Sequence, residues 1–514
     1  MAEPKDQPWP VGSVYSSRVL TRRDLLKAGA LGLFASSCRT GGAPRAGTQG
    51  VVLNDVHSKL NATRVDRVLR PAGLDDLAAA VAEAAGRGQA VSIAGGRHAM
   101  GGQQFGVGTL HLDTSGFDRI LDFDQDTGIL DVEAGAQWPG LIEDIHHLQA
   151  GSGIRWGITQ KQTGADRLSL GGALASNIHG RGLNLAPFVG DIESFTLVNA
   201  TGEVTTCSRS ENPELFRLAV GGYGLFGVVY SIRLRLSRRR KLARVVEVLS
   251  IEELETRVRS RVRDGFLYGD FQFMIDAASP EFLQRGVFSC YRPVDPETPI
   301  PENQQRLGDE DWLRLLELAH FDKARAFEEY SSYYLTTSGQ IYWTDTHQLG
   351  FYADDYHLGL DLRSGSALPA SEMISEVYVP REKLAAFMAE TAEAFREIAA
   401  NVIYGTVRWI ETDRDTFLPW AKAPYAAIVF NLHVGHDGEG IERAKREFRT
   451  LIDLARKRGG SYFLTYHRWA TREQIDDCYP RMPEFLKYKL EHDPDERFQS
   501  NWYRHYRAMF ADLL

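Results

Sequence analysis

Between residues 64 and 236, the spacing of apolar and polar positions switches repeatedly between helical and extended. The apolar positions from Leu74 to Val81 have helical spacing, and Asp75 and Asp76 stand where the first turn of a helix favours acidic residues. Short apolar runs bounded by turn residues predict strands at 90–94, 109–113, 129–134, 195–199, 203–206 and 228–236. The turn Ala200-Thr201-Gly202 joins two of these strands and predicts a hairpin.

A different pattern begins near residue 241, where glycine becomes rarer and aromatic residues become more frequent. Helices are predicted at 381–399 and 440–456, and a strand at 426–433. Helices and strands mixed in this way predict a second α+β domain over 241–479. The remaining residues, 480–514, form a C-terminal segment.

Composition and charge restrict the classes of function. The chain has 514 residues, 43% hydrophobic and 25% charged, so it can bury a large core and is not wholly disordered. A net charge of −9 makes it a poor general nucleic-acid binder, because binding phosphates needs clustered cations. The basic run 237–241 is therefore expected to be a solvated domain junction. The cysteines are too few and too scattered for a disulfide scaffold or a CxxC metal site: Cys38, Cys207, Cys290 and Cys478.

The first forty residues have the features of an export signal. Arg22 and Arg23 precede a short, mildly apolar stretch at 28–35, as in bacterial twin-arginine signals, and Ser36-Ser37-Cys38 resembles an imperfect lipobox. We expect residues 1–38 to direct export by the twin-arginine route, which would leave a periplasmic protein or a membrane-anchored lipoprotein. Residues 39–61 are expected to be a linker. The alternative is a disordered basic tail ahead of a short helix.

Three glycine-rich segments could hold a cofactor. In the first glycine segment, 92–103, a strand runs into two glycine pairs, and consecutive free N–H groups in such a turn suit a diphosphate. In the second, 163–182, Gly171-Gly172 opens a helix of small residues that can lie against a flat ligand. The third, 221–227, contains GxGxxG, but it follows a helix and enters a strand, which is the wrong context for a Rossmann fold.

The order of these segments resembles one family of flavoproteins. Gly-Gly-Arg-His-Ala-Met-Gly-Gly-Gln, Leu-Ser-Leu-Gly-Gly-Ala-Leu-Ala-Ser-Asn-Ile-His-Gly and Gly-Gly-Tyr-Gly-Leu-Phe-Gly-Val-Val resemble motifs of the vanillyl-alcohol-oxidase family. The segment 492–500 resembles the closing Asp-Pro-x-x-x-Phe segment of sugar-lactone, alditol and decaprenylphosphoryl-ribose oxidases. The resemblance implies an α+β fold with a two-subdomain PCMH-type FAD-binding domain at 62–240 and a substrate (cap) domain at 241–479. It also implies that 480–514 returns to the FAD-binding domain.

The resemblance implies FAD as the cofactor. His98 matches the histidine that is joined covalently to the flavin 8α-methyl carbon in cytokinin dehydrogenases and alditol oxidases. Arg97 and Ala99 stand where that family usually has glycine and serine. The decaprenylphosphoryl-ribose relatives hold FAD without such a bond, so a hydrogen-bonding histidine beside a noncovalent flavin is the alternative. The residues matched to FAD-binding positions are Gly95, Gly96, Arg97, His98, Ala99, Gly102, Gln103, Gly164, Ser169, Gly171, Gly172, Ser176, His179, Gly227 and Val228.

The resemblance also implies three catalytic residues in the second domain. Glu376 matches a glutamate that touches substrate, and Arg408 matches an arginine that faces the flavin site; the alternative for both is an ion pair on adjacent strands. His467 lies where alditol oxidases have His-Trp-Gly-Lys, and it is either a base or a packing histidine between aromatic rings. No metal is expected, because His433 and His436 would point to opposite faces of a strand and no third ligand is evident.

Together these features predict an exported FAD-dependent oxidoreductase. It is expected to remove a hydride from a CH–OH group of a polyol, sugar, sugar lactone or related alcohol, with oxygen or another carrier accepting the electrons. The alternatives are a dehydrogenase of an amine, cytokinin-like or phenolic substrate, and an exported flavin-bearing binding lipoprotein without turnover. The expected partners are the small-molecule substrate and the electron acceptor, without nucleic acid, and with membrane contact only through lipid on Cys38.

Overall fold

The computed structural model describes residues 50–514 except 154, 352–355 and 367. Residues 49–514 form one compact unit, so the predicted domain boundary at 240/241 stays a prediction. The predicted export signal and Cys38 lie outside the described residues. Among the helices that the structure describes, none is both long enough and apolar enough to span a bilayer.

A small parallel sheet and a larger antiparallel sheet make up the N-terminal part of the described chain. The parallel sheet has the order β3 (Arg67–Leu69), β5 (Leu110–Asp113), β4 (Val91–Ala94). The antiparallel sheet has the order β10 (Val204–Ser208), β9 (Ile192–Val198), β11 (Val228–Arg235), β7 (Ile129–Glu133), β6 (Ile120–Asp124). The predicted hairpin is confirmed as β9 and β10, which are paired antiparallel.

One helix joins the cores of these two sheets. Helix α2 (Leu74–Gly86) buries Leu77 and Val81 in a hydrophobic cluster that also contains residues of β4, β5, β9 and β11. The other elements of this region are short: β1 (Val51–Leu53), β2 (Thr63–Val65), α3 (Trp138–Leu148), β8 (Trp156–Gly157), α4 (Leu170–Ser176), η1 (Phe188–Asp191), α5 (Pro213–Ala219) and β12 (Ser237–Arg238). Mixed sheets and helices of this kind confirm the α+β class.

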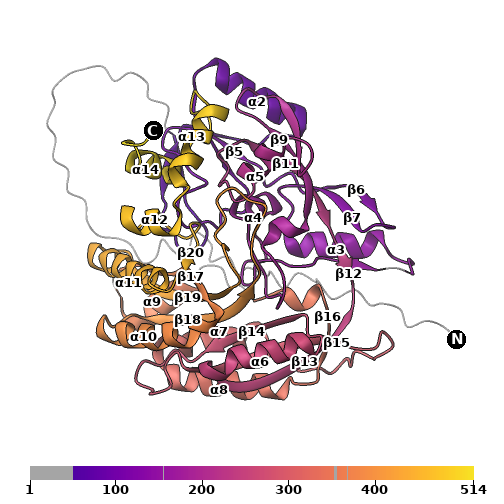
Figure 1. Cartoon of the computed structure of the whole chain (residues 1–514), viewed down its shortest axis with the longest axis vertical. Helices are drawn as coiled ribbons and strands as arrows, with labels where there is room; N and C mark the ends of the chain where they lie inside the picture. Colours follow the sequence, from indigo (N-terminus) through magenta and orange to yellow (C-terminus); the bar gives the residue numbers. More distant parts are fainter. Residues whose placement is uncertain (1–49, 154, 352–355, 367) are drawn as a thin grey trace, which may run out of the picture. The chain divides into compact units, whose positions relative to one another are not determined.

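An eight-stranded sheet dominates the rest of the chain (Figure 1). Its order is β16 (Ile341–Trp343), β13 (Lys241–Ser250), β15 (Arg285–Pro293), β14 (Tyr268–Phe273), β18 (Val402–Ile410), β19 (Tyr425–Gly435), β17 (Ala370–Pro380), β20 (Ser461–Tyr462). The spatial order differs from the chain order, because β19 lies between β18 and β17. This insertion decides which side chains of the sheet become neighbours.

One face of the sheet is apolar. Phe271, Val407, Ile428 and Val377 form one cross-strand row and are fully buried. Three helices pack on this apolar face: α6 (Ile251–Arg263), α10 (Leu384–Glu397) and α11 (Gly438–Arg456). The ring of Phe430 in β19, for example, contacts that of Phe395 in α10.

The opposite face of the sheet carries polar residues, and most of them are buried. Gln272, Thr406 and Glu376 belong to one row that runs through Val429. Because side chains alternate along a strand, this polar face also includes Asp270, Ser289, Glu372, Arg408, Asn431 and His433. Two helices lie on this side, α7 (Asp309–Phe321) and α8 (Lys323–Thr336). The shorter elements around it are η2 (Thr346–Gln348), α9 (His357–Ser364) and η3 (Arg381–Lys383).

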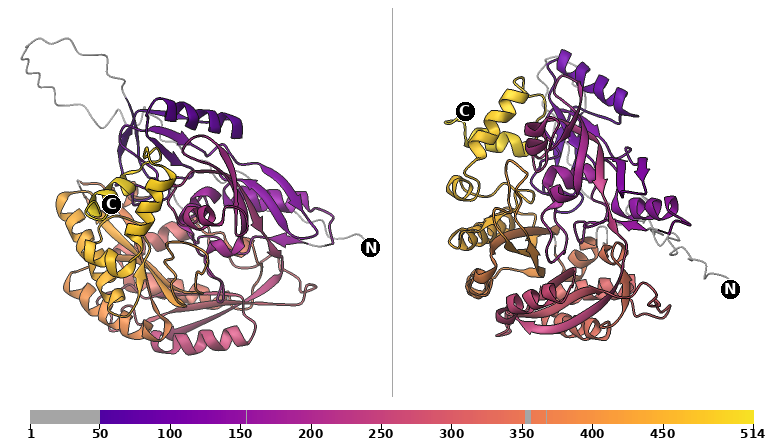
Figure 2. Two further views of the ribbon diagram at one scale, coloured as in Figure 1. Left: turned by 45° about the horizontal axis from the view of Figure 1, so that its top comes forward. Right: turned by 45° about the vertical axis from the view of Figure 1, so that its right-hand side comes forward.

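The C-terminal segment returns to the N-terminal sheet. After helices α12 (Arg472–Cys478) and α13 (Met482–His492), Phe498 forms a parallel bridge with Val91 of β4. The Val91 amide donates to Arg497 O at 2.6 Å, and the Gln499 amide donates to Val91 O at 2.8 Å. Helix α14 (Asn501–Met509) follows, and Figure 2 shows these last helices in yellow beside the indigo N-terminal elements.

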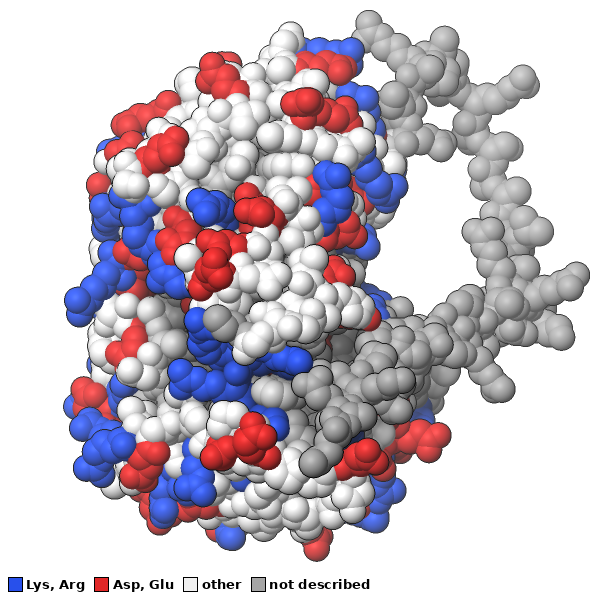
Figure 3. All heavy atoms as spheres, turned by 90° about the vertical axis from the view of Figure 1, so that its right-hand side faces the viewer, with Lys and Arg blue, Asp and Glu red and all other residues white. Residues whose placement is uncertain are grey.

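Charged side chains of both signs are interspersed on the face drawn in Figure 3. The expectation that the basic run 237–241 is a solvated junction needs correction, because the run is not fully solvated. The Arg239 side chain is only 8% exposed and forms an ion pair with Asp345 at 2.8 Å. Its guanidinium also lies 4.2 Å from the ring centroid of Trp343. This arginine therefore holds the start of the large sheet in place instead of extending into solvent.

Candidate functional site

The three glycine segments meet around the short helix α4. Ser169 caps this helix, and its hydroxyl accepts from the amide of Gly172 at 3.4 Å and from that of Gly96, in the first segment, also at 3.4 Å. At the other end of α4, Leu174 O accepts from the Gly221 amide of the third segment at 3.0 Å. Segments far apart in the sequence are thus joined at one helix.

The glycines of the first segment are needed because the backbones approach so closely. A Cβ atom on Gly95 would lie 2.2 Å from Ser169 Oγ, and one on Gly96 would lie 2.5 Å from Arg167 O. Arg97 has a φ of +57°, in the left-handed region that favours glycine. That conformation would suit the glycine that the family resemblance implies at this position.

Buried polar atoms that make no hydrogen bond lie in or next to the first two glycine segments. They are Gln103 Oε1, Gln104 Oε1, Gln162 Oε1 and Thr163 Oγ1. Leaving a buried polar group unpaired costs about 1–3 kcal/mol, so such atoms are rare unless a ligand or water satisfies them. A ligand with many polar atoms would therefore fit between these segments.

A loop of the C-terminal half closes over the same region. Thr465 O accepts from the amides of Met100 and Gly101 at 3.2 and 3.1 Å, and the Thr465 hydroxyl lies 3.4 Å from that of Ser176. Gln103 Nε2 donates to the neighbouring Leu464 O at 2.9 Å. This loop, 463–470, thus touches both the first and the second glycine segment.

The remaining predicted cofactor residues lie in or next to these segments. Ala99 and His98 are partly buried in the first segment, and Gly102 and Gly164 turn with φ of +74° and +77°. Gly171 approaches Ala134 so closely that a Cβ would lie 3.1 Å from Ala134 Cβ. Gly227 immediately precedes β11, and Val228 is a core residue paired with Val198. The Val228 side chain therefore belongs to the core, and only its backbone is left to contact a cofactor.

His179, just after α4, makes the most important contact between the two halves of the chain. Its Nε2 bonds Glu376 Oε1 in β17, and its Nδ1 lies 2.9 Å from Gly180 O. The carbonyl can only accept a hydrogen bond, and so can the carboxylate when it is ionised. Both imidazole nitrogens of His179 therefore face hydrogen-bond acceptors. Both side chains are fully buried.

The Glu376 carboxyl is held in its ionised form. Burial favours the neutral acid, but the adjoining His179 and Arg408 outweigh burial and keep the pKa of Glu376 below its usual range. Its second oxygen accepts from the Tyr466 hydroxyl at 3.2 Å. Burial raises the pKa of Tyr466 well above its usual value, so this phenol stays protonated and donates.

Arg408 lies on the polar face but is not a neighbour of Glu376 in the sheet. Because β19 separates β18 from β17, the alternative of an ion pair on adjacent strands is wrong, and the described ion-pair partner of Glu376 is His179. Arg408 is 4% exposed, and its Nε and Nη1 make no hydrogen bond. A buried guanidinium with free donors can bind an anionic or oxygen-rich group.

His467 lies in an apolar setting. Its ring contacts the rings of Phe448 and Trp469, and burial lowers its pKa well below the usual value. The described hydrogen bonds of the Glu376 carboxylate go to His179 and Tyr466. The structure thus brings Glu376 together with His179 and Tyr466, and the catalytic role of His467 stays a prediction.

Two groups of polar residues were missed in the sequence. Lys161 is fully buried, and its Nζ lies 2.5 Å from Asp166 Oδ1 and donates to Gln162 O at 2.8 Å. Burial lowers the pKa of Lys161.

Several polar-face atoms are buried without a hydrogen bond: Asp270 Oδ1, Gln272 Oε1, Ser289 Oγ, Thr406 Oγ1 and Asn431 Oδ1. In the segment 268–273, Asp270 and Gln272 alternate with phenylalanines, and this alternation could have predicted a strand with one polar face.

Comparison with known proteins identifies the N-terminal part. Residues 65–208 match the family model described as an FAD binding domain. The chain contains an FAD-binding domain. The match includes the first two glycine segments and α4, whose close backbones and unpaired amide oxygens fit a cofactor with a diphosphate and several hydroxyl groups. FAD is therefore the cofactor, and the residues placed to hold it are those of the first glycine segment and of 163–182.

The chain is similar to two kinds of dehydrogenase. An L-gulono-1,4-lactone dehydrogenase of Mycobacterium tuberculosis is 28% identical over 251 residues, which is 47% of this chain and 53% of the relative. Cytokinin dehydrogenase 4 of Oryza sativa subsp. japonica is 24% identical over 461 residues, 83% of each chain. Cytokinin dehydrogenase 3 of Arabidopsis thaliana is 24% identical over 345 residues, 64% of each. The chain thus spans about half the length of the lactone dehydrogenase that it matches.

Proposed function

We propose that this protein is an FAD-dependent oxidoreductase that oxidises a CH–OH group of an oxygen-rich small molecule, such as a sugar lactone, sugar or polyol. The observation that carries the proposal is the buried His179–Glu376 pair, which joins the FAD-binding domain to the polar face. An ionised carboxylate at this junction is well placed to handle the proton of a substrate hydroxyl.

Each residue of the site has a distinct part in this reaction. Bound FAD supplies the acceptor for the hydride that leaves the substrate carbon. Glu376 accepts the hydroxyl proton, and His179 and Tyr466 hold its two oxygens in place. The free guanidinium donors of Arg408 stabilise negative charge on the substrate oxygen.

The polar face favours an oxygen-rich substrate over a cytokinin-like one. An apolar amine bound there would leave four oxygen atoms without a hydrogen bond, at about 1–3 kcal/mol for each: Asp270 Oδ1, Gln272 Oε1, Thr406 Oγ1 and Asn431 Oδ1. Substrate hydroxyl and carbonyl groups would satisfy them. The similarity to cytokinin dehydrogenases over 83% of the chain supports the second candidate, a dehydrogenase of a cytokinin-like amine.

Anaerobic bleaching of the flavin absorbance separates these candidates. The protein loaded with FAD is mixed with a panel of sugar lactones, sugars and polyols, and separately with cytokinin-type amines and phenols. We expect bleaching by members of the first group. Bleaching only by amines would replace the main proposal with the second. No bleaching by any compound, with FAD bound normally, would favour a flavin-bearing binding protein.

We further propose that His98 is joined covalently to the flavin, because it lies in the first glycine segment beside Gly96. After acid precipitation the yellow colour is expected in the pellet, and His98→Ala should release it to the supernatant. Arg97→Gly is the matched control and should keep the covalent fraction. Colour released from the unaltered protein would mean a noncovalent flavin. Export by residues 1–38 and lipid on Cys38 stay proposals of the same kind.

A further inference from the structure

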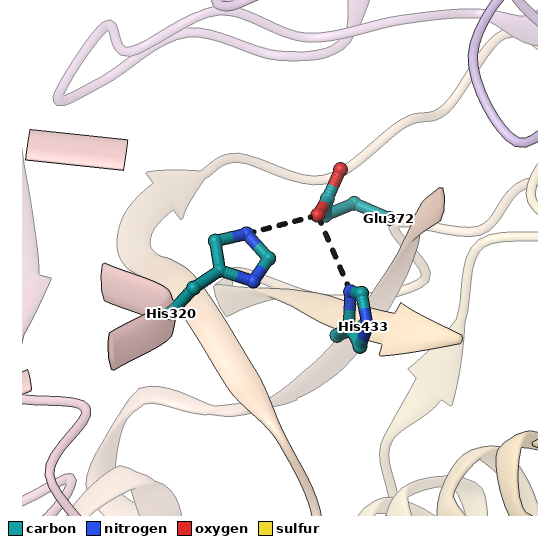
Figure 4. A group of neighbouring side chains, drawn as sticks. All are labelled: His320, Glu372 and His433. Atoms are coloured by element: carbon teal, nitrogen blue, oxygen red, sulfur yellow. Dashed lines mark ion pairs between the residues drawn. The ribbon is translucent and has the colours of Figure 1, made fainter. Parts of the chain in front are cut away.

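Three side chains converge at the end of the polar face opposite to the α4 contact. His320 of α7, Glu372 of β17 and His433 of β19 point toward one another (Figure 4). Glu372 Oε1 lies 3.1 Å from His320 Nε2 and 3.5 Å from His433 Nδ1. Glu372 and His433 are directly opposite in the β17–β19 register. The potential ligand atoms all lie within 4.8 Å of one another.

We propose that His320, Glu372 and His433 bind a divalent transition-metal ion of the zinc class. The site lies outside the FAD-binding domain, which matches only residues 65–208. Along β17, Glu372 is four residues from Glu376, about 13 Å for an extended strand. The metal site is therefore separate from the carboxylate proposed to handle the substrate proton.

The spacing of the ligand atoms is compatible with a bound metal ion. Zinc bonds of about 2.0–2.2 Å in a tetrahedral site place neighbouring ligand atoms about 3.4 Å apart, and the two measured distances lie on either side of that value. His320 Nε2, His433 Nδ1 and both oxygens of Glu372 are buried, and their described contacts are the ion pairs between Glu372 and the surrounding histidines. A bound ion would take the place of the contacts that Glu372 Oε1 makes with His320 and His433.

Charge leads to the same conclusion. The Glu372 side chain is 2% exposed. All of the described ion-pair partners of this buried carboxylate are histidines. A divalent cation bound among these residues would balance the buried negative charge.

The donor set indicates which ion would bind. Two imidazole nitrogens and one carboxylate suit zinc and its neighbours, whereas magnesium and calcium prefer oxygen donors only. His357 Nδ1 lies 2.7 Å from Glu372 Oε2, so it positions the second oxygen and leaves Oε1 to the metal. His433 is 28% exposed, which gives the ion a route from solvent. Three protein ligands leave a fourth position for water or a substrate oxygen.

This arrangement explains why the sequence pattern was misleading. His436, three residues along from His433, is hydrogen-bonded to Ser371 Oγ at 2.8 Å. The partners of His433 come from a neighbouring strand and a helix instead, so two further candidate ligands lie beside it in space.

Metal binding can be tested without measuring turnover. The flavin-loaded full-length protein is treated with a chelator, titrated with Zn²⁺ by calorimetry, and checked by elemental analysis after gel filtration. We expect one zinc per chain and a higher melting temperature with zinc than with chelator. Binding of less than one zinc per chain, or no shift in melting temperature, would overturn the proposal.

Matched variants locate the site. Glu372→Gln and His433→Ala should each weaken zinc binding by about 100-fold or more, since each removes one of three ligands. Glu376→Gln, on the same strand, should keep one zinc per chain. Flavin absorbance and circular dichroism show whether each variant is folded; if one is not, the titration of the unaltered protein still decides. Unchanged zinc affinity in folded Glu372→Gln would refute the assignment, whatever the substrate panel shows.

Discussion

The two faces of the eight-stranded sheet are both largely buried, yet they differ in what covers them. On the apolar face, Phe271, Val407 and Phe430 pack under α6, α10 and α11. On the polar face, Gln272 and Thr406 carry buried oxygen atoms without a hydrogen bond. Alternation along each strand lets one set of strands serve both purposes.

This difference separates stability from chemistry. Each phenylalanine buried on the apolar face stabilises the fold by about 1.5–3 kcal/mol. Each unpaired polar group on the other face costs about 1–3 kcal/mol until something binds to it. The apolar face therefore stabilises a sheet whose other side is prepared for a ligand, and substitutions on the two faces should have different effects.

The largest effect is expected from Glu376→Gln on the polar face. The amide keeps the shape of the side chain but cannot accept a proton, so the rate of flavin reduction by substrate should fall by about 10²–10⁴-fold. Stopped-flow absorbance of the flavin measures this rate. Tyr466→Phe, which removes only the hydrogen bond to the same carboxylate, should have a smaller effect. A rate unchanged in Glu376→Gln would show that this carboxylate is not the base.

A comparable loss, but in stability, is expected from Phe430→Ala on the apolar face. Phe430 is fully buried against Phe273 and Phe395, and truncating such a ring costs about 3–5 kcal/mol of unfolding free energy. Urea denaturation measures the loss. The rate of flavin reduction per folded molecule should stay close to that of the unaltered protein. A large fall in that rate would break the proposed division between the faces.

The next effect depends on pH and involves Glu447 of α11, over the apolar face. Burial raises the pKa of Glu447 to about 7, above its unfolded value, so the folded protein binds the extra proton. Stability from this group is then lost as pH rises from about 4.5 to 7, by about 3 kcal/mol in total. Glu447→Gln should therefore be more stable than the unaltered protein at pH 8 but not at pH 4.

Denaturant titrations across pH measure this difference. Glu439→Gln, at an exposed position of the same helix, is the control and should show no such dependence. Parallel pH curves for Glu447→Gln and the unaltered protein would contradict the prediction.

The smallest effect is expected from a comparison of two buried threonines, Thr406 on the polar face and Thr391 in α10. Thr406→Val removes a buried hydroxyl that makes no hydrogen bond and should raise the unfolding free energy by about 1 kcal/mol, while weakening substrate binding. Thr391→Val in α10 removes a hydroxyl that donates to Phe387 O at 2.8 Å, and it should lower the unfolding free energy by about 1 kcal/mol. Equal changes in the two variants would mean that the polar face carries no unsatisfied groups.

Local features were predictable from the sequence, and contacts between distant segments were not. The β9–β10 hairpin and the helix that begins at the Gly171-Gly172 pair depend on neighbouring residues, and both are present. The alternative of an ion pair between Glu376 and Arg408 on adjacent strands is wrong, because β19, which follows β18 in the chain, inserts between β18 and β17. Strand order depends on packing of the whole sheet, and periodicity along one strand does not contain it.

The same limit applies to the candidate sites. The sequence indicates Glu376, but its partner His179 lies 197 residues away, and no pattern links the two positions. Along the chain, His467 carries more evident chemistry than its neighbour Tyr466, yet Tyr466 is the residue that contacts Glu376. The sequence places His433 near His436, whereas the partners of His433 are a residue opposite in the sheet and one on a helix.

The bridge between Val91 and Phe498 has a consequence for biosynthesis. The edge of the parallel sheet that carries the first glycine segment pairs with Phe498, which follows Val91 by 407 positions in the chain. A growing chain on the ribosome therefore exposes that edge until residues 497–499 have been made. The N-terminal sheets can collapse earlier, but β4 gains its outer backbone partners only when this late segment folds back onto it.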